Sequence, residues 1–196
     1  DVKDYTGRLS FKTNNGALNK LGVSEARISD IREFIADLHK KDIYVIGRIT
    51  VFQDPFFATQ RPDLAVVKES DKTLWVDYKG LHYIDPGATE AWDYTVLIAK
   101  EAYAVGFDEI NFDYIRFPSD GNMQDVYFPF SEERITADPN YGKAKVMRDF
   151  FSYLHAELIG IDAVLSADLF GMTTTNADDL NIGQVLELAL PHFDYI

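Results

Sequence analysis

Hydrophobic residues recur along the chain with the periods of two kinds of element. In residues 29–40 the apolar positions follow the i, i+3, i+4, i+7 spacing of a helix that buries one stripe. An almost continuous run of β-branched and aromatic residues follows at 43–52, which is typical of a parallel strand covered on both faces. The pattern therefore predicts a helix followed at once by a buried strand.

The same order recurs toward the C-terminus. The spacing predicts helices at residues 89–105, 143–159 and 179–190, and strands at 107–117, 161–168 and from 193 onward. Gly106, Gly160 and Pro191 follow these helices and supply stop signals. We expect parallel strands at about residues 43–50, 109–115, 164–167 and from 193, adjacent in that order, with helices outside and no paired hairpin strands.

The α/β order leaves a choice between a doubly wound sheet and a barrel. No Gly-rich nucleotide-binding loop follows any strand, whereas the strand-to-helix loops at 53–88 and 119–142 are long. Long loops at the C-terminal ends of strands build the active sites of (β/α)8 barrels. The sequence thus predicts one α/β domain, residues 1–196, forming a partial TIM barrel incomplete at both ends. An incomplete barrel leaves an open sheet edge, so we expect the isolated chain to be sticky or unstable.

Composition narrows the classes of partner. The 196 residues include 19 basic and 32 acidic ones, giving a net charge of −13 that repels nucleic-acid backbones and anionic lipid. No apolar stretch approaches the roughly 20 residues that cross a bilayer, and no signal segment opens this fragment. We therefore expect no nucleic-acid partner and no membrane insertion. The absence of Cys excludes disulfides and fits either a reducing compartment or a secreted protein.

The strongest candidate for chemistry lies in the strand at 107–117. Strand alternation places Asn111 and Asp113 on one face, with Asp113 near the C-terminal end. A buried charge is costly unless it is paired or used, and we expect Arg116 to pair with Asp113 and keep it ionised. On these residues alone, a structural ion pair and a catalytic carboxylate are equally supported. Glu109, at the start of the strand, is expected to be solvated or to form a cap.

Asp168 ends the next predicted strand, one βα unit after Asp113. Because consecutive strands of a barrel lie side by side, both carboxylates would face the same mouth. Glycoside hydrolysis needs such a pair, one ionised as nucleophile or base and one protonated as acid. Taken alone, Asp168 is more simply explained as a cap on the following loop. The pair favours catalysis, with Asp113 as nucleophile or base and Asp168 as general acid.

Other side chains are predicted to bind substrate around the mouth of the barrel. They are Lys3 and Asp4 at the end of the first strand segment, Arg48 and Asp54 in and just beyond the strand at 43–52, Trp75 and Tyr83 in the loop at 53–88, and Asn111 and Arg116. Each has a structural alternative. Chain-end residues are usually solvated, Arg48 can satisfy a neighbour, and loop aromatics commonly pack a loop down rather than stack on sugars.

No cofactor or metal is expected. The His residues at 39, 82, 155 and 192 fall on helix ends, a loop and a strand start, without His-x-His or His-Glu-x-x-His spacing. A hard cation held by Asp113 and Asp168 is the alternative left open. The sequence has no Gly-x-Ser-x-Gly elbow and no Cys, so covalent catalysis by Ser or Cys lacks its signature.

Five segments carry motifs that occur together in one known family. They are residues 1–7, 49–55, 61–65, 106–118 and 166–171, and Phe-Asp-Tyr-Ile-Arg-Phe-Pro at 112–118 is the most specific of them. In this order they resemble the glycoside-hydrolase-like domain family catalogued as domain of unknown function 4015. The resemblance covers essentially the whole chain.

The resemblance implies a (β/α)8 barrel, of which this chain holds about strand two to the start of strand six. It also implies that Asp113 ends strand four and Asp168 ends strand five. One departure lies at 82–86, where the family pattern has a Trp at an aromatic position; Trp75 or Tyr83 would compensate for it. Since the family's activity is itself inferred from fold, the resemblance names a class of reaction and not a substrate.

These features lead to one principal hypothesis and two alternatives. The principal one is a glycoside hydrolase that cleaves a polysaccharide by paired carboxylates, outside the cell or in a bacterial cell envelope. The alternatives are a carbohydrate-binding barrel without catalysis and a metal-dependent hydrolase that uses the same acids. An enzyme needs one acid of the pair held protonated, whereas a binding module needs only aromatics and hydrogen-bond donors.

Overall fold

The computed structural model describes residues 1–196 and contains a three-stranded parallel sheet. β1 (Ile46–Thr50), β3 (Glu109–Asp113) and β5 (Val164–Ala167) lie in the order β1-β3-β5. Their registers pair Arg48 with Asn111, and Asn111 with Ser166. The predicted order of parallel strands is confirmed, although each strand is shorter than the hydrophobic run that predicted it.

Two further segments continue the sheet in parallel beyond its outer strands. Lys3 forms a bridge with Ile49 of β1, and Tyr195 forms one with Ser166 of β5. A hydrogen bond of 3.1 Å from Ala167 N to Tyr195 O helps to hold the second segment. The segment predicted as a strand from 193 therefore lies beside β5, as expected, but it makes a single bridge rather than a regular ladder.

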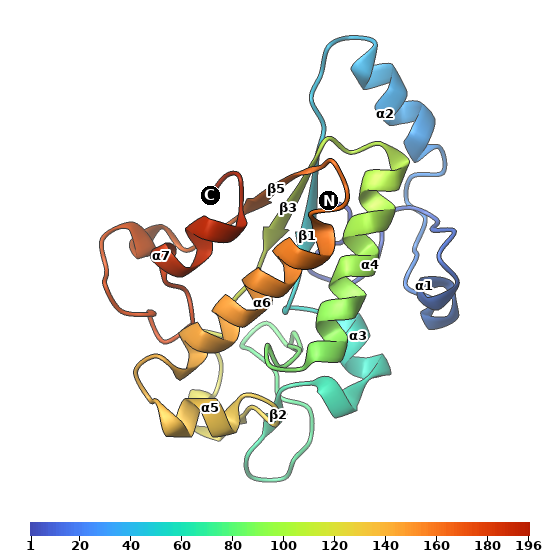
Figure 1. Ribbon diagram of the computed structural model, residues 1–196. Coiled ribbons are helices and arrows are strands. Elements are labelled where there is room, and N and C mark those ends of the chain that lie inside the picture. The colour runs from blue at the N-terminus through green and yellow to red at the C-terminus, as the bar shows by residue number, and fades with distance from the viewer.

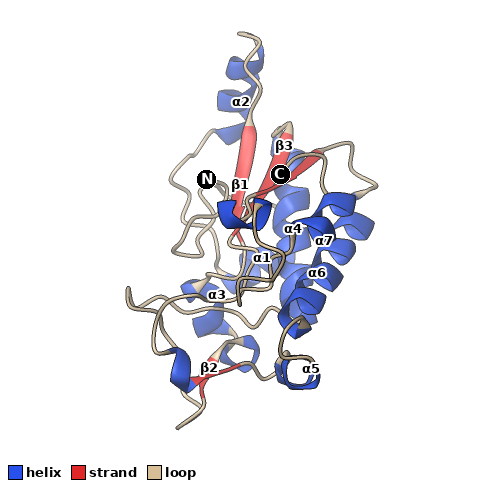
Figure 2. Cartoon of the chain, turned by 90° about the vertical axis from the view of Figure 1, so that its left-hand side faces the viewer, coloured by secondary structure: helices blue, strands red, loops and turns tan.

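Helices α4 (Thr89–Val105) and α6 (Gly142–Leu158) lie side by side against one face of the sheet (Figures 1 and 2). Both match their predicted spans to within one residue. Gly106 adopts a left-handed conformation, with φ of 116°, and ends α4 as predicted. α2 (Ile31–His39) also lies where it was predicted and projects beyond the starting ends of the strands (Figure 1). None of the helices is long and apolar enough to cross a membrane.

The helix predicted at 179–190 is wrong over most of its length. Only α7 (Leu186–Ala189) is α-helical in this region. Leu180 and Asn181 have φ angles of 52° and 57°, which interrupt a right-handed helix. Gly183, with φ of 81°, lies so close to α6 that an added Cβ would be 2.8 Å from Met147 Cγ. The apolar residues in this segment pack a tight turn against α6 and do not form a helix.

The two long strand-to-helix segments are more ordered than the sequence predicted. Between β1 and α4 lie α3 (Pro55–Gln60) and β2 (Val67–Lys68), and between β3 and α6 lie β4 (Val126–Tyr127) and α5 (Glu132–Ala137). β2 and β4 pair antiparallel. They come from different loops and form no hairpin, and neither was predicted as a strand. Both segments extend beyond the C-terminal ends of the strands, at the bottom of Figure 1.

Several short elements complete the chain. α1 (Gly16–Leu21) precedes α2, and its start is capped by Asn15, whose side chain accepts hydrogen bonds from two backbone amides. Single 3-10 turns occur at Pro62–Leu64, Met123–Asp125, Gly171–Thr174 and Leu190–His192. Helices this short carry little periodicity, which explains why the hydrophobic pattern did not reveal them.

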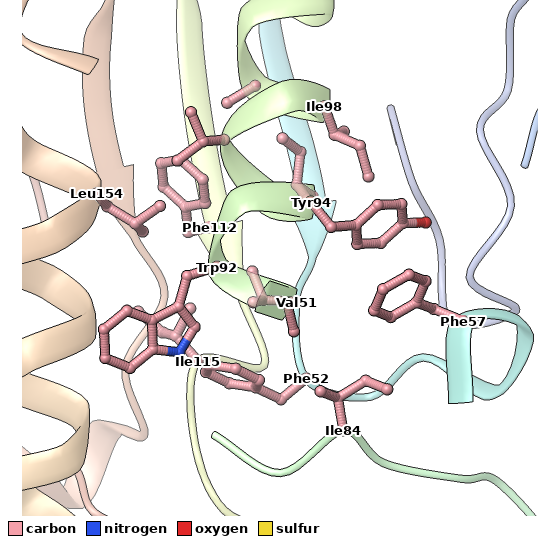
Figure 3. Close-up of a cluster of buried hydrophobic side chains, with 14 of the residues drawn as sticks. Val51, Phe52, Phe57, Ile84, Trp92, Tyr94, Ile98, Phe112, Ile115 and Leu154 are labelled. Carbon is pink, nitrogen blue, oxygen red and sulfur yellow. The ribbon is translucent and has the colours of Figure 1, made fainter. Parts of the chain in front are cut away.

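The hydrophobic core fills the space between the sheet and the helices (Figure 3). Phe112 of β3, Trp92 of α4 and Leu154 of α6 are all buried in it. The Trp92 ring lies 5.7 Å from that of Phe150, centroid to centroid. Burial of each such side chain contributes about 1.5–3 kcal/mol, so this cluster fixes the helices on one face of the sheet. The opposite face of the sheet carries the polar side chains.

Candidate active site

Alternation along β3 and β5 brings two carboxylates together on the polar face of the sheet. Asn111 pairs in register with Ser166, so two residues further on Asp113 lies beside Asp168. Both carboxylates line a pocket of about 270 Å³, which we call the carboxylate pocket. Its other lining residues are Arg48, Tyr114, Arg116, Leu169, Phe170 and Gln184. The two acids singled out by the sequence thus share one cavity at the ends of adjacent strands.

Asp113 is held as an ion pair by Arg48. The Arg48 Nε donates a hydrogen bond of 2.9 Å to Asp113 Oδ2, and Nη2 donates to the same oxygen. The other carboxylate oxygen, Oδ1, accepts a hydrogen bond of 2.6 Å from the backbone N–H of Tyr114. Thr50 of β1 pairs with Asp113, and Arg48 lies two residues before Thr50, on the same face of the sheet. Charge-assisted hydrogen bonds of this kind are stronger than neutral ones and fix the orientation of the carboxylate.

Arg116 is not the partner of Asp113, which corrects the expectation from sequence. Its Nη1 donates hydrogen bonds to Phe117 O at 3.0 Å and to Ser119 Oγ at 3.1 Å. The guanidinium lies over the Tyr114 ring, 5.0 Å from the centroid. The physical reason is the backbone of Tyr114, whose φ of 53° ends the regular alternation of β3. Arg116 therefore lines the carboxylate pocket without forming an ion pair.

Asp168 is held by a row of neutral hydrogen bonds. Asn111 Nδ2 donates to Asp168 Oδ1 and to Ser166 Oγ, both at 3.1 Å. Ser166 Oγ donates in turn to Glu109 Oε1 at 2.5 Å, and Tyr44 Oη donates to Glu109 Oε2 at 3.1 Å. Glu109 is thus buried and hydrogen-bonded rather than solvated as expected. Neither Ser166 nor Tyr44 was predicted to have a role, although the two-residue period of the strands is the signal that places Ser166 in this row.

A second cavity adjoins the carboxylate pocket. Its volume is about 430 Å³, and we call it the side pocket. The residues lining it are Tyr5, Arg48, Gln53, Lys79, Leu81 and Tyr114. Arg48 and Tyr114 line both pockets, so the two cavities are neighbours, and we call them together the cleft.

Lys3 and Asp54 do not line this cleft, contrary to the prediction that they bind substrate. They form an ion pair of 2.5 Å in which each side chain is 1% exposed. Asp54 Oδ1 also accepts a hydrogen bond of 2.7 Å from Phe57 N and so caps the start of α3. Gly7 packs directly on this carboxylate, since a Cβ there would lie 2.0 Å from Asp54 Oδ1. The pair is a sealed structural contact that a ligand does not reach.

Asp4, also predicted to bind substrate, is occupied by protein contacts. It pairs with Arg27, and its Oδ1 accepts a hydrogen bond of 2.9 Å from Thr6 N. Burial alone would raise the pKa of Asp4, but the hydrogen bonds from Arg27 and Thr6 outweigh burial and lower it. Asp4 thus fastens the N-terminal segment to the loop before α2.

Trp75 and Tyr83 pack the long loop instead of presenting their faces to a sugar. Each is only 1% exposed, and their rings meet edge to face with centroids 6.1 Å apart. Trp75 Nε1 donates to Asn122 O at 3.0 Å, and Tyr83 Oη donates to Gln53 Oε1 at 2.9 Å. Burial raises the pKa of Tyr83. The structural alternative for these two aromatics is therefore confirmed, and the prediction that they stack on sugars is wrong.

Replacing Gly121 with Ala should destabilise the packing around Trp75. Gly121 has φ of 126°, and an added Cβ would lie 2.4 Å from the Trp75 ring. We expect the free energy of unfolding to fall by at least about 2 kcal/mol, from backbone strain and overpacking together. Urea unfolding followed by circular dichroism measures this loss.

Gly80→Ala is the matched control, since Gly80 also has a positive φ, of 78°, but faces open space. There we expect only the backbone cost of about 1–2 kcal/mol. An equal loss in both variants would contradict the tight packing of Trp75 on Gly121.

The acidic side chains are not arranged as a metal centre. No group of three or more His, Cys, Asp or Glu side chains lies close enough together to hold a metal ion. Asp113 is paired with Arg48, and Asp168 accepts from Asn111. The geometry therefore suits acid–base or nucleophilic chemistry by the two carboxylates.

The whole chain matches a known protein family. Residues 1–196 match the family model described as "putative glycosyl hydrolase domain". Among solved structures, a hypothetical protein from Ruminiclostridium thermocellum ATCC 27405 is 34% identical, with a TM-score of 0.74 over 87% of this chain and 82% of that one. A search of the curated proteins finds no match.

Two enzymes share the fold at lower identity. The chitobiase of Flavobacterium johnsoniae is 13% identical, with a TM-score of 0.56 over 85% of this chain and 25% of that one. An α-galactosidase from Lactobacillus brevis is 14% identical, with a TM-score of 0.53 over 74% of this chain and 19% of that one. At such identities the likeness concerns the fold alone, a parallel sheet with outer helices. The match along the full length decides the family: the chain belongs to the glycosyl hydrolase domain family described above.

Proposed function

We propose that the protein is a glycoside hydrolase that cleaves a polysaccharide by means of Asp113 and Asp168. One observation carries the proposal: two carboxylates from adjacent strand ends line one pocket, and only one of them has a cationic partner. Glycoside hydrolysis requires two carboxyl groups in different protonation states on either side of the scissile bond. Membership of the family supports the reaction class.

The contacts of the two carboxylates suggest a role for each. The Arg48 guanidinium and the Tyr114 N–H bind and orient the Asp113 side chain, which suits a nucleophile or a general base. Asp168 makes no ion pair and accepts from the neutral amide of Asn111, and we assign it the role of general acid. In this mechanism Asp168 protonates the glycosidic oxygen, while Asp113 attacks the anomeric carbon or activates a water molecule.

The stereochemical outcome follows from the separation of the carboxyl groups. Retaining enzymes place them about 5–5.5 Å apart and inverting enzymes about 6.5–9.5 Å apart. Both distances are compatible with side chains that project from neighbouring strands, which lie about 4.8 Å apart. The anomer first released, observed by proton NMR, distinguishes the two routes.

We further propose that the sheet is part of a (β/α)8 barrel and that the enzyme acts outside the cell or in a bacterial cell envelope. In such barrels the active site lies at the C-terminal ends of the strands, within the loops that follow them. The loops bearing α3, β2, β4 and α5 gather at this end of the sheet (Figure 1). This arrangement supports the carboxylate pocket as the active site.

Replacing Asp168 with Asn should abolish hydrolysis of the polysaccharide but spare that of dinitrophenyl glycosides. A sugar alkoxide leaves only when it is protonated, whereas a dinitrophenolate leaves without a proton. We therefore expect kcat/KM, which reports cleavage of the glycosidic bond, to fall at least about a hundredfold on the polysaccharide, the usual size of a general-acid contribution, and to change little on the aryl glycoside. Reducing-end assays and phenolate absorbance measure the two rates.

Asp162→Asn is the matched control, because Asp162 precedes the other end of β5 and is exposed. It should leave both rates unchanged. An equal loss of kcat/KM on both substrates in Asp168→Asn would exclude the general-acid role. A protein that binds glycans from a broad polysaccharide panel but hydrolyses none of them would instead be a carbohydrate-binding barrel.

A further inference from the structure

The side pocket is lined by two cationic side chains and by no carboxylate. Arg48 and Lys79 line it, and none of its six lining residues is an Asp or a Glu. This is unusual on a protein with 32 acidic and 19 basic residues. Most acidic side chains near the cleft are committed elsewhere: Asp113 and Asp1 both bind Arg48, and Asp54 binds Lys3.

Lys79 is available to a ligand in this pocket. Its side chain is exposed, makes no ion pair and donates no hydrogen bond within the protein. It lies in the turn before Gly80, where the Asp77 side chain accepts from the Lys79 backbone N–H at 2.8 Å and fixes the chain. The loop is therefore ordered while its ammonium group remains free.

Gln53 gives the pocket a second donor. It is only 4% exposed, and its Oε1 accepts a hydrogen bond of 2.9 Å from the buried Tyr83 Oη. That bond fixes the orientation of the amide and leaves Nε2 without a partner in the protein. The amide nitrogen is not one of the protein's buried, unsatisfied polar atoms, so it reaches the cavity and can donate to an acceptor there.

The pocket offers groups that suit two parts of an acidic sugar. The Tyr5 and Tyr114 hydroxyls both donate and accept, so they suit sugar hydroxyls. Lys79 and the Gln53 amide nitrogen only donate, and Gln53 Oε1 already accepts from Tyr83. A carboxylate or sulfate group, which only accepts, satisfies such donors.

Arg116 places another cation in the carboxylate pocket, where its Nη1 also donates to Phe117 O and Ser119 Oγ. Tyr114 lines this pocket and the side pocket. Lys79 and Arg116 therefore line the two adjoining pockets, one in each. A chain carrying a negative group on successive sugars would meet one of them in each pocket.

We propose that the side pocket is a subsite for an acidic sugar unit, one that carries a carboxylate or a sulfate group, bound by Lys79 and the Gln53 amide. This inference rests on the proposed glycoside hydrolase function and names its substrate class as acidic glycans. The free Lys79 ammonium forms a charge-assisted hydrogen bond with the anionic group. The partly exposed Tyr5 and Tyr114 rings lie beside the sugar ring.

Titration calorimetry with matched oligosaccharides tests the proposal. The probes are oligomers of galacturonic, glucuronic and mannuronic acid, the same oligomers after reduction of their carboxyl groups to alcohols, and sulfated forms of the reduced oligomers. We expect at least one charged form to bind about tenfold more tightly than its neutral counterpart, the value of one charged hydrogen bond. This advantage should shrink in high salt because the ions are screened. The carboxylated and sulfated arms distinguish the two anions.

Lys79→Gln should remove about tenfold of the affinity for the charged oligomer, and Lys79→Arg should keep most of it. Lys41→Gln is the control: it removes the same charge from an exposed, unpaired Lys just after α2, before β1 begins. Equal binding of charged and neutral oligomers, binding of none, or equal effects of Lys79→Gln and Lys41→Gln would overturn the proposal. Hydrolysis of neutral glycans alone would overturn the acidic-sugar subsite and leave the hydrolase function intact. Charge-selective binding without hydrolysis would support the subsite and contradict the hydrolase function.

Discussion

Replacing Asp113 with Asn is expected to abolish glycoside hydrolysis while leaving the fold and sugar binding intact. The amide keeps the shape of the side chain and its hydrogen bond from Tyr114 N, but it cannot attack an anomeric carbon or deprotonate water. We expect a loss of at least about a thousandfold in kcat, in line with the removal of a catalytic nucleophile. Reducing-end release measures the rate, calorimetry measures binding, and circular dichroism measures folding.

Asp1→Asn provides the matched control. Asp1 Oδ1 accepts from Nη1 of the same Arg48 at 3.0 Å, but Asp1 does not line the carboxylate pocket. The two variants therefore remove the same charge from the same guanidinium, and only one of them changes the proposed nucleophile. We expect full activity in Asp1→Asn. Full activity in Asp113→Asn would show that the Arg48 pair is structural and would favour a carbohydrate-binding barrel.

The pattern of the sequence predicted the elements that are long and amphipathic. α4 and α6 each have 17 residues, which is enough for several repeats of the helical period, and their spans agree with the prediction to within one residue. The segment at 179–190 has the same spacing of apolar residues but contains Leu180 and Asn181 in left-handed conformations. Periodicity reports which residues are buried, and a packed turn can bury the same positions as a helix.

The sequence also located the two carboxylates, because both stand at the ends of strands that are adjacent in a parallel sheet. It assigned the wrong cation to Asp113. Arg116 is near in sequence, but Tyr114 turns the backbone before it. Arg48 is 65 residues away along the chain, and only the register of β1 on β3 brings it to Asp113. Pairing across a sheet depends on register, which local sequence does not reveal.

The remaining corrections share one cause, the burial of groups that were expected to be exposed. A residue at a strand end can point into the mouth of a site or into the packing beneath the loops. Lys3 and Asp54 satisfy each other, so both charges are buried without an unpaired group. Trp75 and Tyr83 find hydrogen-bond partners within the loops in the same way. The sequence shows which functional group such a residue carries. It does not show whether a residue from elsewhere in the chain already pairs with that group.

The buried pair of Lys3 and Asp54 leads to the largest stability effect we expect. In Lys3→Met, Asp54 keeps its hydrogen bond from Phe57 N but loses its only cation while fully buried. Breaking a buried pair from one side costs about 3–5 kcal/mol, because the remaining charge has no compensation. Urea unfolding at neutral pH should show a loss of this size. Lys40→Met, in the exposed pair with Asp37, is the control and should change stability little.

The loss should depend on pH in a direction set by Asp54. Burial raises the pKa of this carboxyl even in the intact protein, where Lys3 acts to lower it. Without Lys3 the folded-state pKa rises further above that of the unfolded chain, so folding stability declines as pH increases through the folded-state value. The penalty in Lys3→Met should therefore be smaller in mildly acidic solution than at neutral pH.

The double variant Lys3→Met/Asp54→Asn separates the buried charge from lost packing. Asn retains an oxygen for Phe57 N and leaves no charge behind, so most of the stability should return. Its stability should also lose the pH dependence of the single variant, because no carboxyl remains to titrate. A double variant as unstable as Lys3→Met would mean that the Lys3 side chain acts through its packing beside Tyr94, where its ammonium lies 5.2 Å from the ring centroid, and not through its charge.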